Sequence, residues 1–291
     1  MIPKIVHYCF FTSPSGKPWS LIHHVCLKSA VEHIKPTDVR FYCEIEPTGP
    51  WWELSRQMVT VERIEAPRKI FGNPVDHLAH RADVIRLEKL LASGGIYLDI
   101  DVFVHRSFDD LLNHGTVLGQ QRVSGDLVGL CNAVILAEAH APFIERWYSE
   151  YRSFRGGNKY WDEHSVHVPL QLSRQLPAQI TVLPHYAFFW PTYEPEDLAL
   201  IFETATPIDV SRSHATHLWE TIAWDQYLEH LTPGQVRGVD SNFHHWARPM
   251  IALLPDNYGL PPFADRLARG VRTLKRRLRA AINGRRTGGN R

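Results

Sequence analysis

Two aspartates, Asp99 and Asp101, follow a short apolar run at residues 96–98. Residues two apart on a strand point to the same side, so both carboxylates can face one partner. Carboxylate oxygens suit a hard divalent cation such as Mg²⁺ or Mn²⁺, which can in turn bridge substrate phosphates. The pair therefore predicts a metal site for a phosphate-bearing substrate, although Asp-x-Asp also occurs by chance in surface loops.

A second pair, Asp83 and Arg86, lies one helical turn apart within residues 76–92, whose apolar residues have helical spacing. The carboxylate can accept hydrogen bonds from sugar or ribose hydroxyls, and the guanidinium can donate them. A salt bridge within the helix is the alternative. Gly94 and Gly95 predict that the helix ends immediately before the apolar run that precedes Asp99.

The elements that would position these residues alternate between strands and helices. Strands are expected at residues 2–11, 39–43, 59–64, 96–98, 131–137 and 180–183, and helices at 19–34, 76–92, 142–154 and 169–176. This alternation predicts an α/β fold with a Rossmann-like sheet, in which ligands bind at the carboxyl ends of the strands. Residues 184–216, which carry several prolines and aromatics, are expected to form loops over the site.

Composition narrows the class of protein. The chain has 291 residues, of which 44% are hydrophobic and 22% charged, as in a globular domain. Its four cysteines form no Cys-x-x-Cys pair, so reduced thiols are expected rather than a zinc site. Without an apolar run of 18 residues or a signal-peptide pattern, neither a spanning helix nor secretion is expected.

The formal net charge of +1 hides a division of charge along the chain. Residues 265–291 carry ten Lys and Arg against one Asp, and the rest of the chain carries 22 basic against 30 acidic residues. Apolar residues of this region recur at helical spacing: Phe263, Leu267, Val271, Leu274, Leu278 and Ile282. We expect a catalytic domain at 1–262 and a basic amphipathic helix at 263–291.

This basic helix is expected to contact an anionic membrane surface or to pack its apolar stripe on the body. The acidic body argues against a nucleic-acid partner. We therefore expect a cytoplasmic protein, which would be peripheral on the cytoplasmic face of the inner membrane where the helix contacts lipid.

Three segments together resemble the Asp-x-Asp sugar-binding-region glycosyltransferases, glycosyltransferase family 32, of the capsular polysaccharide synthesis type. They are Ile-Pro-Lys-Ile-x-His at residues 2–7, Ala-Asp-x-x-Arg at 82–86, and Gly-Gly-x-Tyr-x-Asp-x-Asp at 94–101. The resemblance implies a GT-A-like mixed sheet flanked by helices. It also implies metal-dependent sugar transfer, with retention of configuration, from a nucleoside-diphosphate sugar to a glycan hydroxyl. UDP is the favoured nucleotide, and bacterial surface polysaccharide or glycolipid synthesis, on a glycan or lipid-linked glycan acceptor, is the expected role.

The resemblance also assigns roles to residues. Asp99 and Asp101 would hold Mn²⁺ or Mg²⁺, with His217 of a His-x-Trp motif as third ligand and His214 as the weaker candidate. The expected catalytic residues are Asp83, Arg86, Asp99 and Asp101. Of these, Asp83 and Arg86 would hold the donor sugar. The expected substrate-binding residues are Val6, His7, Tyr8, Tyr97, Asn132 and Trp219.

Two other functions share parts of these motifs. Phosphatases of the haloacid-dehalogenase type also place Asp-x-Asp after a strand, but they need a small hydroxyl residue four positions past the first Asp, where this chain has Phe103. A non-catalytic protein that binds sugar nucleotides or glycans could keep the same fold. The presence of both motif carboxylates and of Arg86 argues for catalysis.

Overall fold

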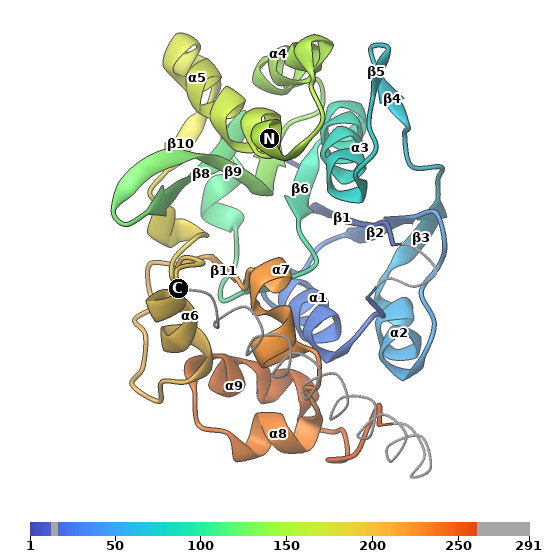
Figure 1. Ribbon diagram of the computed structural model, residues 1–291, viewed down its shortest axis with the longest axis vertical. Helices are drawn as coiled ribbons and strands as arrows, with labels where there is room; N and C mark the ends of the chain where they lie inside the picture. The colour runs from blue at the N-terminus through green and yellow to red at the C-terminus, as the bar shows by residue number, and fades with distance from the viewer. Residues whose placement is uncertain (13–16, 261–291) are drawn as a thin grey trace, which may run out of the picture.

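A computed structural model describes residues 1–12 and 17–260 and contains a seven-stranded mixed sheet (Figure 1). The strand order is β10-β8-β9-β6-β1-β2-β3. Its strands are β1 (Ile5–Phe10), β2 (Asp38–Cys43), β3 (Thr60–Arg63), β6 (Gly95–Leu98), β8 (Thr116–Val123), β9 (Asp126–Ala137) and β10 (Thr181–Leu183). Two small ladders join β4 (Lys69–Ile70) to β5 (Asn73–Pro74), and β7 (Val102–Val104) to β11 (Ala215–His217).

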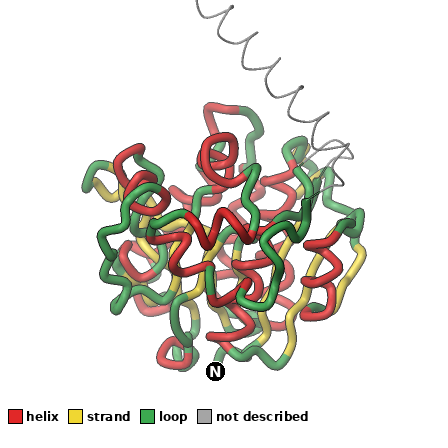
Figure 2. Tube along the Cα trace, turned by 90° about the horizontal axis from the view of Figure 1, so that it is seen from below, coloured by secondary structure: helices red, strands yellow, loops and turns green. Residues whose placement is uncertain are grey.

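Helices cover both faces of the sheet. Figure 1 shows α3 (Leu78–Ser93), α4 (Pro142–Glu150) and α5 (Val168–Gln175) above the sheet, with α1 (Leu21–Ile34), α2 (Pro50–Ser55) and α7 (Glu220–Ala223) below it. Further from it lie α6 (Pro195–Phe202), α8 (Pro233–Gly238) and α9 (Asn242–Ala247). Seen from below, helices lie in front of the strands (Figure 2). The predicted α/β class, a mixed sheet flanked by helices, is confirmed.

Short helical turns connect these elements. The 3₁₀ turns are Arg56–Met58, Asp109–Leu111, Tyr151–Ser153, Asn158–Tyr160, Pro177–Gln179, His185–Ala187 and Pro249–Ile251, and the π-helical turns are Glu163–His167 and Trp224–Leu228. The expected loop region 184–216 thus contains one helix, α6, and the start of β11.

The directions of the central strands determine at which edge of the sheet the residues after β6 lie. Strand β1 is parallel to β2 and β6, and residues 6–10 are buried, as in a strand covered on both faces. Strand β9 runs antiparallel to β6, with Leu98 opposite Val134. Because β9 begins eight residues before Val134, the β8–β9 hairpin projects past the carboxyl end of β6.

The glycines after α3 allow a tight turn into β6. Gly94 and Gly95 have φ of +62° and +123°, which L side chains rarely adopt. A Cβ at Gly95 would lie 2.5 Å from the carbonyl oxygen of Ile5. The predicted end of the helix is confirmed, and the turn fixes where β6 and the following carboxylates start.

The sequence also made predictions about the cysteines, about membrane-spanning helices and about the C-terminal region. All four cysteines are buried and free. Among the described helices, none combines the length and the apolar character needed to cross a membrane. The proposed basic helix at 263–291, and the domain boundary at 262, lie outside the described residues.

Buried histidines predict loss of stability at mildly acidic pH. Burial lowers the pKa of His7, His24 and His244 to about 4. Between about pH 6.5 and pH 4 the unfolded chain therefore binds more protons than the folded chain, so the free energy of unfolding falls as pH falls, by up to about 1.4 kcal/mol per pH unit for each histidine. In thermal melts, His24→Gln should show a shallower fall over this window than the wild type, and an equal slope would contradict the prediction.

Candidate active site

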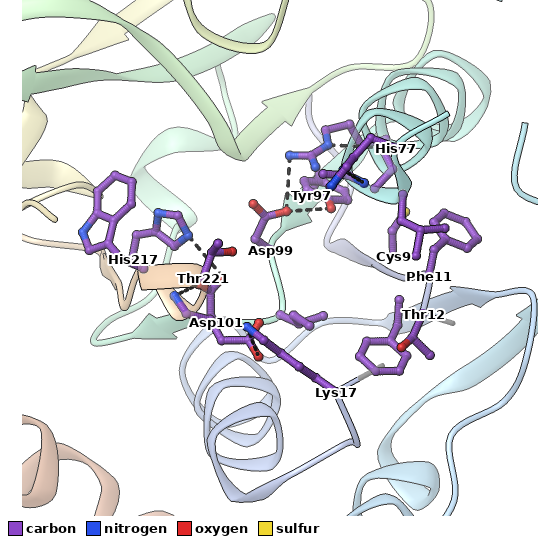
Figure 3. A pocket seen from close by; sticks show the side chains of 18 of the residues that line it. Cys9, Phe11, Thr12, Lys17, His77, Tyr97, Asp99, Asp101, His217 and Thr221 are labelled. Carbon is purple, nitrogen blue, oxygen red and sulfur yellow. Dashed lines mark hydrogen bonds and ion pairs between the residues drawn. The ribbon is translucent and has the colours of Figure 1, made fainter. Parts of the chain in front are cut away.

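A cavity of about 480 Å³ opens where β1 and β6 end, between the first turn of α3 and the β11–α7 connection (Figure 3). Figure 3 shows Asp99 and Asp101 between His217 on one side and the Tyr97 and His77 side on the other. The cavity is lined by Cys9, Phe10, Phe11, Thr12, Lys17, His77, Leu78, Ala79, Ala82, Arg86, Tyr97, Asp99, Ile100, Asp101, His217, Trp219, Glu220, Thr221 and Ile222. The two motif aspartates and Arg86 thus share one cavity.

Backbone pairing brings His217 to Asp101. The Asp99 N–H donates to the carbonyl of Ala133 at 2.8 Å, which holds the turn against β9. The strand after the turn, β7, pairs with β11, and the register places His217 opposite Val102. His217 Nε2 then lies 3.2 Å from Asp101 Oδ1, although 116 residues separate the two in sequence.

Asp99, Asp101 and His217 form a candidate metal centre. Each offers a ligand atom, and these atoms all lie within 4.8 Å of one another. The buried Nδ1 of His217 has no hydrogen-bond partner among the described residues, which therefore satisfy only one of the two ring nitrogens. Two carboxylates and an imidazole are a donor set that suits Mn²⁺ or Mg²⁺. The three residues predicted as ligands are therefore brought together and fit a divalent cation.

His214 occupies a different environment. Its Nδ1 lies 3.0 Å from the carbonyl oxygen of Ser107, its Nε2 lies 2.7 Å from Arg106 Nη2, and its ring packs against Phe108 and Phe188. His214 does not line the cavity. The geometry therefore favours His217 over His214 as the third ligand.

Charges within the centre oppose the effect of burial. Burial alone would raise the pKa of Asp101, but the charge and hydrogen bond of His217 and the Glu220 N–H lower it to about 2. Burial would lower the pKa of His217, yet Asp101 and Asp99 raise it. At Asp99, burial and the neighbouring Asp101 raise the pKa against the opposing effect of Arg86. Such crowded carboxylates favour a bound cation.

Arg86 is the buried cation of the cavity wall. Its guanidinium donates to the Asn132 carbonyl at 2.7 Å and pairs with Asp83 at 3.1 Å and Asp99 at 3.2 Å. It also lies 4.4 Å from the ring centre of Tyr97, whose hydroxyl donates to Asp99 at 2.8 Å. These contacts fix the guanidinium beside the metal ligands.

Asp83 and Asn132 lie behind this cation. Both are buried, and the Asn132 amide donates to Asp83 Oδ1 at 2.7 Å. Neither side chain lines the cavity. In this structure they position Arg86, and their predicted contact with the donor sugar stays a prediction.

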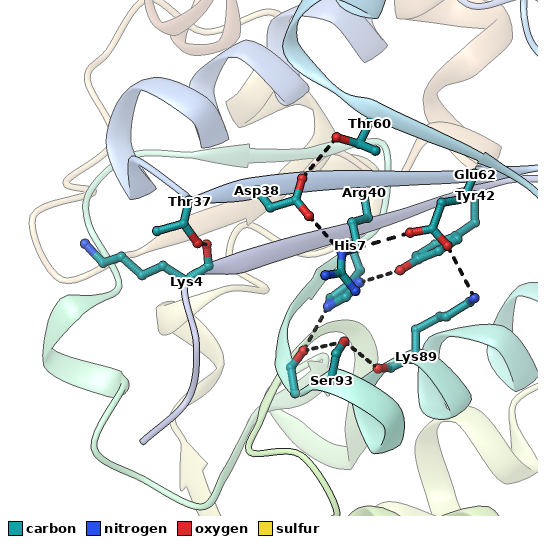
Figure 4. A network of polar contacts seen from close by, with 11 residues as sticks. Lys4, His7, Thr37, Asp38, Arg40, Tyr42, Thr60, Glu62, Lys89 and Ser93 are labelled. Carbon is teal, nitrogen blue, oxygen red and sulfur yellow. Dashed lines mark hydrogen bonds and ion pairs between the residues drawn. The ribbon is translucent and has the colours of Figure 1, made fainter.

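The structure does not bring Val6, His7 and Tyr8, which were predicted to bind the substrate, to the cavity lining. Val6 and Tyr8 are buried in the core, and His7 contacts the Tyr42 hydroxyl and the Gly94 carbonyl (Figure 4). Strand β1 continues to Phe10, so the cavity begins only at Cys9 and is lined from there to Thr12.

The sequence reasoning missed Lys17 and Glu220, which line the cavity below the metal centre. Glu220 donates its backbone N–H to Asp101 Oδ2 at 2.7 Å, and its carboxylate lies 3.1 Å from His23 Nε2 and 3.5 Å from Lys17 Nζ. The preceding Trp219 adopts a left-handed conformation, with φ of +55°, and lines the cavity, while its role in binding substrate stays a prediction. The position of Glu220 just after the His-x-Trp motif was the available signal.

Replacing His217 should weaken metal binding. His217→Gln removes the imidazole, and the apparent affinity for Mn²⁺ in the presence of UDP should fall by about tenfold or more. His214→Gln is the matched control and should keep the wild-type affinity. Isothermal titration measures both. Equal affinities of His217→Gln and the wild type would remove His217 from the ligand set.

The sequence comparisons agree with this site. The family model described as "Glycosyltransferase sugar-binding region containing DXD motif" matches residues 31–118. Glucan organizing enzyme 1 of Cryptococcus neoformans is 38% identical over 263 residues, covering 86% of this chain and 71% of that protein. Mannosyl phosphorylinositol ceramide synthase SUR1 of Saccharomyces cerevisiae is 28% identical over 163 residues, covering 55% of this chain and 37% of that protein.

The chain belongs to the glycosyltransferases whose sugar-binding region contains a DXD motif. It is a glycosyltransferase, as predicted, with Asp99 and Asp101 as the aspartates of that motif. The matched relatives named above are fungal proteins.

Solved structures with related architecture are distant. The bifunctional glycosyltransferase WbbM is 10% identical with a TM-score of 0.48, covering 87% of this chain and 50% of that one. An active-site mutant of LgtC is 13% identical with a TM-score of 0.45, covering 87% of this chain and 98% of that one. These TM-scores are too low to support the fold assignment, which rests on the strand order and directions of the sheet.

Proposed function

We propose that this glycosyltransferase moves a hexose from a UDP-sugar to a hydroxyl of a glycan, depends on Mn²⁺ or Mg²⁺, and retains the anomeric configuration. The observation that carries the proposal is the cluster of Asp99, Asp101 and His217 in one cavity with Arg86. A cation would neutralise the phosphates of a nucleoside-diphosphate donor, and among the described residues this cluster has the ligands to hold one.

The bound cation would stabilise the charge that develops on the leaving diphosphate. Arg86 adds a fixed positive charge beside Asp99, and its contacts with Asp83 and the Asn132 carbonyl keep it in place before the substrate arrives. Phe10, Phe11 and Thr12, at the end of β1, form the wall on which we place the base and ribose.

In the proposed step, the acceptor oxygen bonds to C1 of the donor sugar while the bond from C1 to the phosphate oxygen breaks. The acceptor proton passes to the leaving phosphate oxygen. The cavity carboxylates Asp99, Asp101 and Glu220 are each paired with a cation or a histidine, which favours this front-face transfer over a covalent intermediate. A β-linked product from an α-linked donor, identified by NMR, would contradict retention.

The acceptor is proposed as a cell-surface polysaccharide or glycolipid. The name of one relative refers to glucan and that of the other to a mannosylated ceramide lipid, which supports a saccharide or lipid-linked acceptor. From the sequence resemblance we also propose that the chain belongs to glycosyltransferase family 32 and acts in bacterial surface polysaccharide synthesis of the capsular type.

The experiment that tests the donor is a hydrolysis screen. UDP-glucose, UDP-galactose, UDP-N-acetylglucosamine and GDP-mannose are each incubated with the full chain and Mn²⁺, and release of the nucleotide is measured. We expect turnover with one UDP-sugar that chelation by EDTA abolishes and Mn²⁺ restores. Turnover with GDP-mannose alone would contradict the proposal that the donor carries UDP. Turnover that EDTA leaves intact would contradict the proposed dependence on a metal ion.

Location at the cytoplasmic face of a membrane is also proposed, from the basic residues at 265–291. Deleting these residues should abolish sedimentation with vesicles that contain phosphatidylserine. Unchanged sedimentation of the shortened chain would refute the proposal.

A further inference from the structure

Trp161 is an exposed aromatic ring beside the cavity. Its exposed fraction is 43%, whereas Trp19, Trp52, Trp147 and Trp219 are each 8% exposed or less. Packing in the interior accounts for the four buried tryptophans. It does not account for an indole that is this exposed beside a substrate cavity.

The chain holds this ring in place. The carbonyl of Trp161 lies 3.0 Å from His80 Nε2, and its ring centre lies 4.5 Å from that of His77 and 4.8 Å from that of His80. The contact with His77 is edge-on, with an interplanar angle of 83°. His80 is buried and packs in turn against Phe154, so the support is rigid.

The same contacts connect Trp161 to the reaction site. His77 caps the first turn of α3, where its Nδ1 accepts a hydrogen bond from the Ala79 N–H at 3.2 Å, and it lines the cavity together with Ala82 and Arg86. Trp161 therefore stands at the α3 side of the cavity, one ring beyond a lining residue.

A charged residue follows the exposed indole in the sequence. The neighbouring Asp162 has an exposed carboxylate, 3.5 Å from His167 Nε2. Burial and the charge of Asp162 raise the pKa of Tyr193, whose ring centre lies 5.0 Å from that of Trp219 in the cavity lining.

We propose that Trp161 and Asp162 form the binding platform for the saccharide acceptor, a proposal that rests on the proposed transfer to a glycan. The apolar C–H face of a pyranose packs on an aromatic ring, and its hydroxyls donate to a carboxylate beside it. A lipid chain or an apolar protein surface would be matched by a broader apolar patch. An exposed indole next to Asp162 and His77 instead suits a polyhydroxylated ring.

Saturation-transfer NMR tests the platform without a donor. The probes are laminaritetraose, a glucose tetrasaccharide, and mannobiose, a mannose disaccharide. The wild type should transfer saturation to the ring protons of at least one probe. Trp161→Ala should weaken this signal by about fivefold or more, the effect of losing an aromatic contact of about 1 kcal/mol, while Trp161→Phe keeps most of it.

The matched control is Phe71→Ala, because Phe71 is 42% exposed and lies on the β4–β5 turn, away from the cavity lining. This variant should behave as the wild type. Equal signals from Trp161→Ala and the wild type, or no signal from the wild type with either probe, would overturn the proposal. UDP-sugar hydrolysis by the same preparations reports separately on the donor proposal, so failure of one is distinguishable from failure of the other.

Discussion

Asp101→Asn is expected to reduce sugar transfer by about 10³-fold or more, because it removes the charge that holds the cation and stabilises the leaving diphosphate. Asp101 is 6% exposed, and both its oxygens are engaged, one near His217 Nε2 and the other by the Glu220 N–H. An amide of the same shape keeps the volume but carries no charge. The initial rate of UDP release at saturating donor measures the loss.

The matched control for this variant is Asp110→Asn. Asp110 is exposed and pairs with Arg106 at 3.4 Å, outside the cavity lining. This variant should keep wild-type turnover and melting temperature. If Asp101→Asn retained more than a tenth of wild-type turnover, the assignment of Asp101 to the metal would be untenable.

Arg86→Met is expected to destabilise the fold by about 3–5 kcal/mol, because it leaves the buried carboxylate of Asp83 and the partly buried carboxylate of Asp99 without their cation. Arg86 is 4% exposed and pairs with both Asp83 and Asp99. The free energy of unfolding from urea titration measures the effect. Activity should fall with it, since the charge beside the motif is lost.

An exposed ion pair gives the contrast. Arg56 pairs with Glu46 at 2.8 Å with a side chain about half exposed. Arg56→Met should cost about 1 kcal/mol or less, as exposed pairs usually do. Similar losses in Arg56→Met and Arg86→Met would mean that burial does not amplify the Arg86 interactions.

The sequence predicted the local parts of the site because they are coded locally. The spacing of Asp83 and Arg86 on one helix, the Gly-Gly turn, and the two aspartates after β6 all lie within one continuous segment. The structure places these side chains where that spacing implies.

The remaining parts depend on register between distant segments. The end of β1 cannot be read from an apolar run that continues past it, so the residues expected to bind substrate start at Val6, whereas the cavity lining on β1 starts at Cys9. Strand β8 was not expected because Gly119, Gln120 and Gln121 interrupt its apolar pattern. Glu220 contacts Asp101 through its backbone N–H, so its residue type did not identify it, and only its position just after the His-x-Trp motif pointed to it.

The ladder between β7 and β11 has a consequence for the order in which the enzyme matures during synthesis. The two motif aspartates leave the ribosome long before His217, which follows Asp101 by 116 residues. A nascent chain that has completed β7 already carries both carboxylates but not yet the imidazole of His217. The growing protein therefore cannot assemble the three-residue centre until β11 has been synthesised. A cation can bind all three ligands only after that point of synthesis.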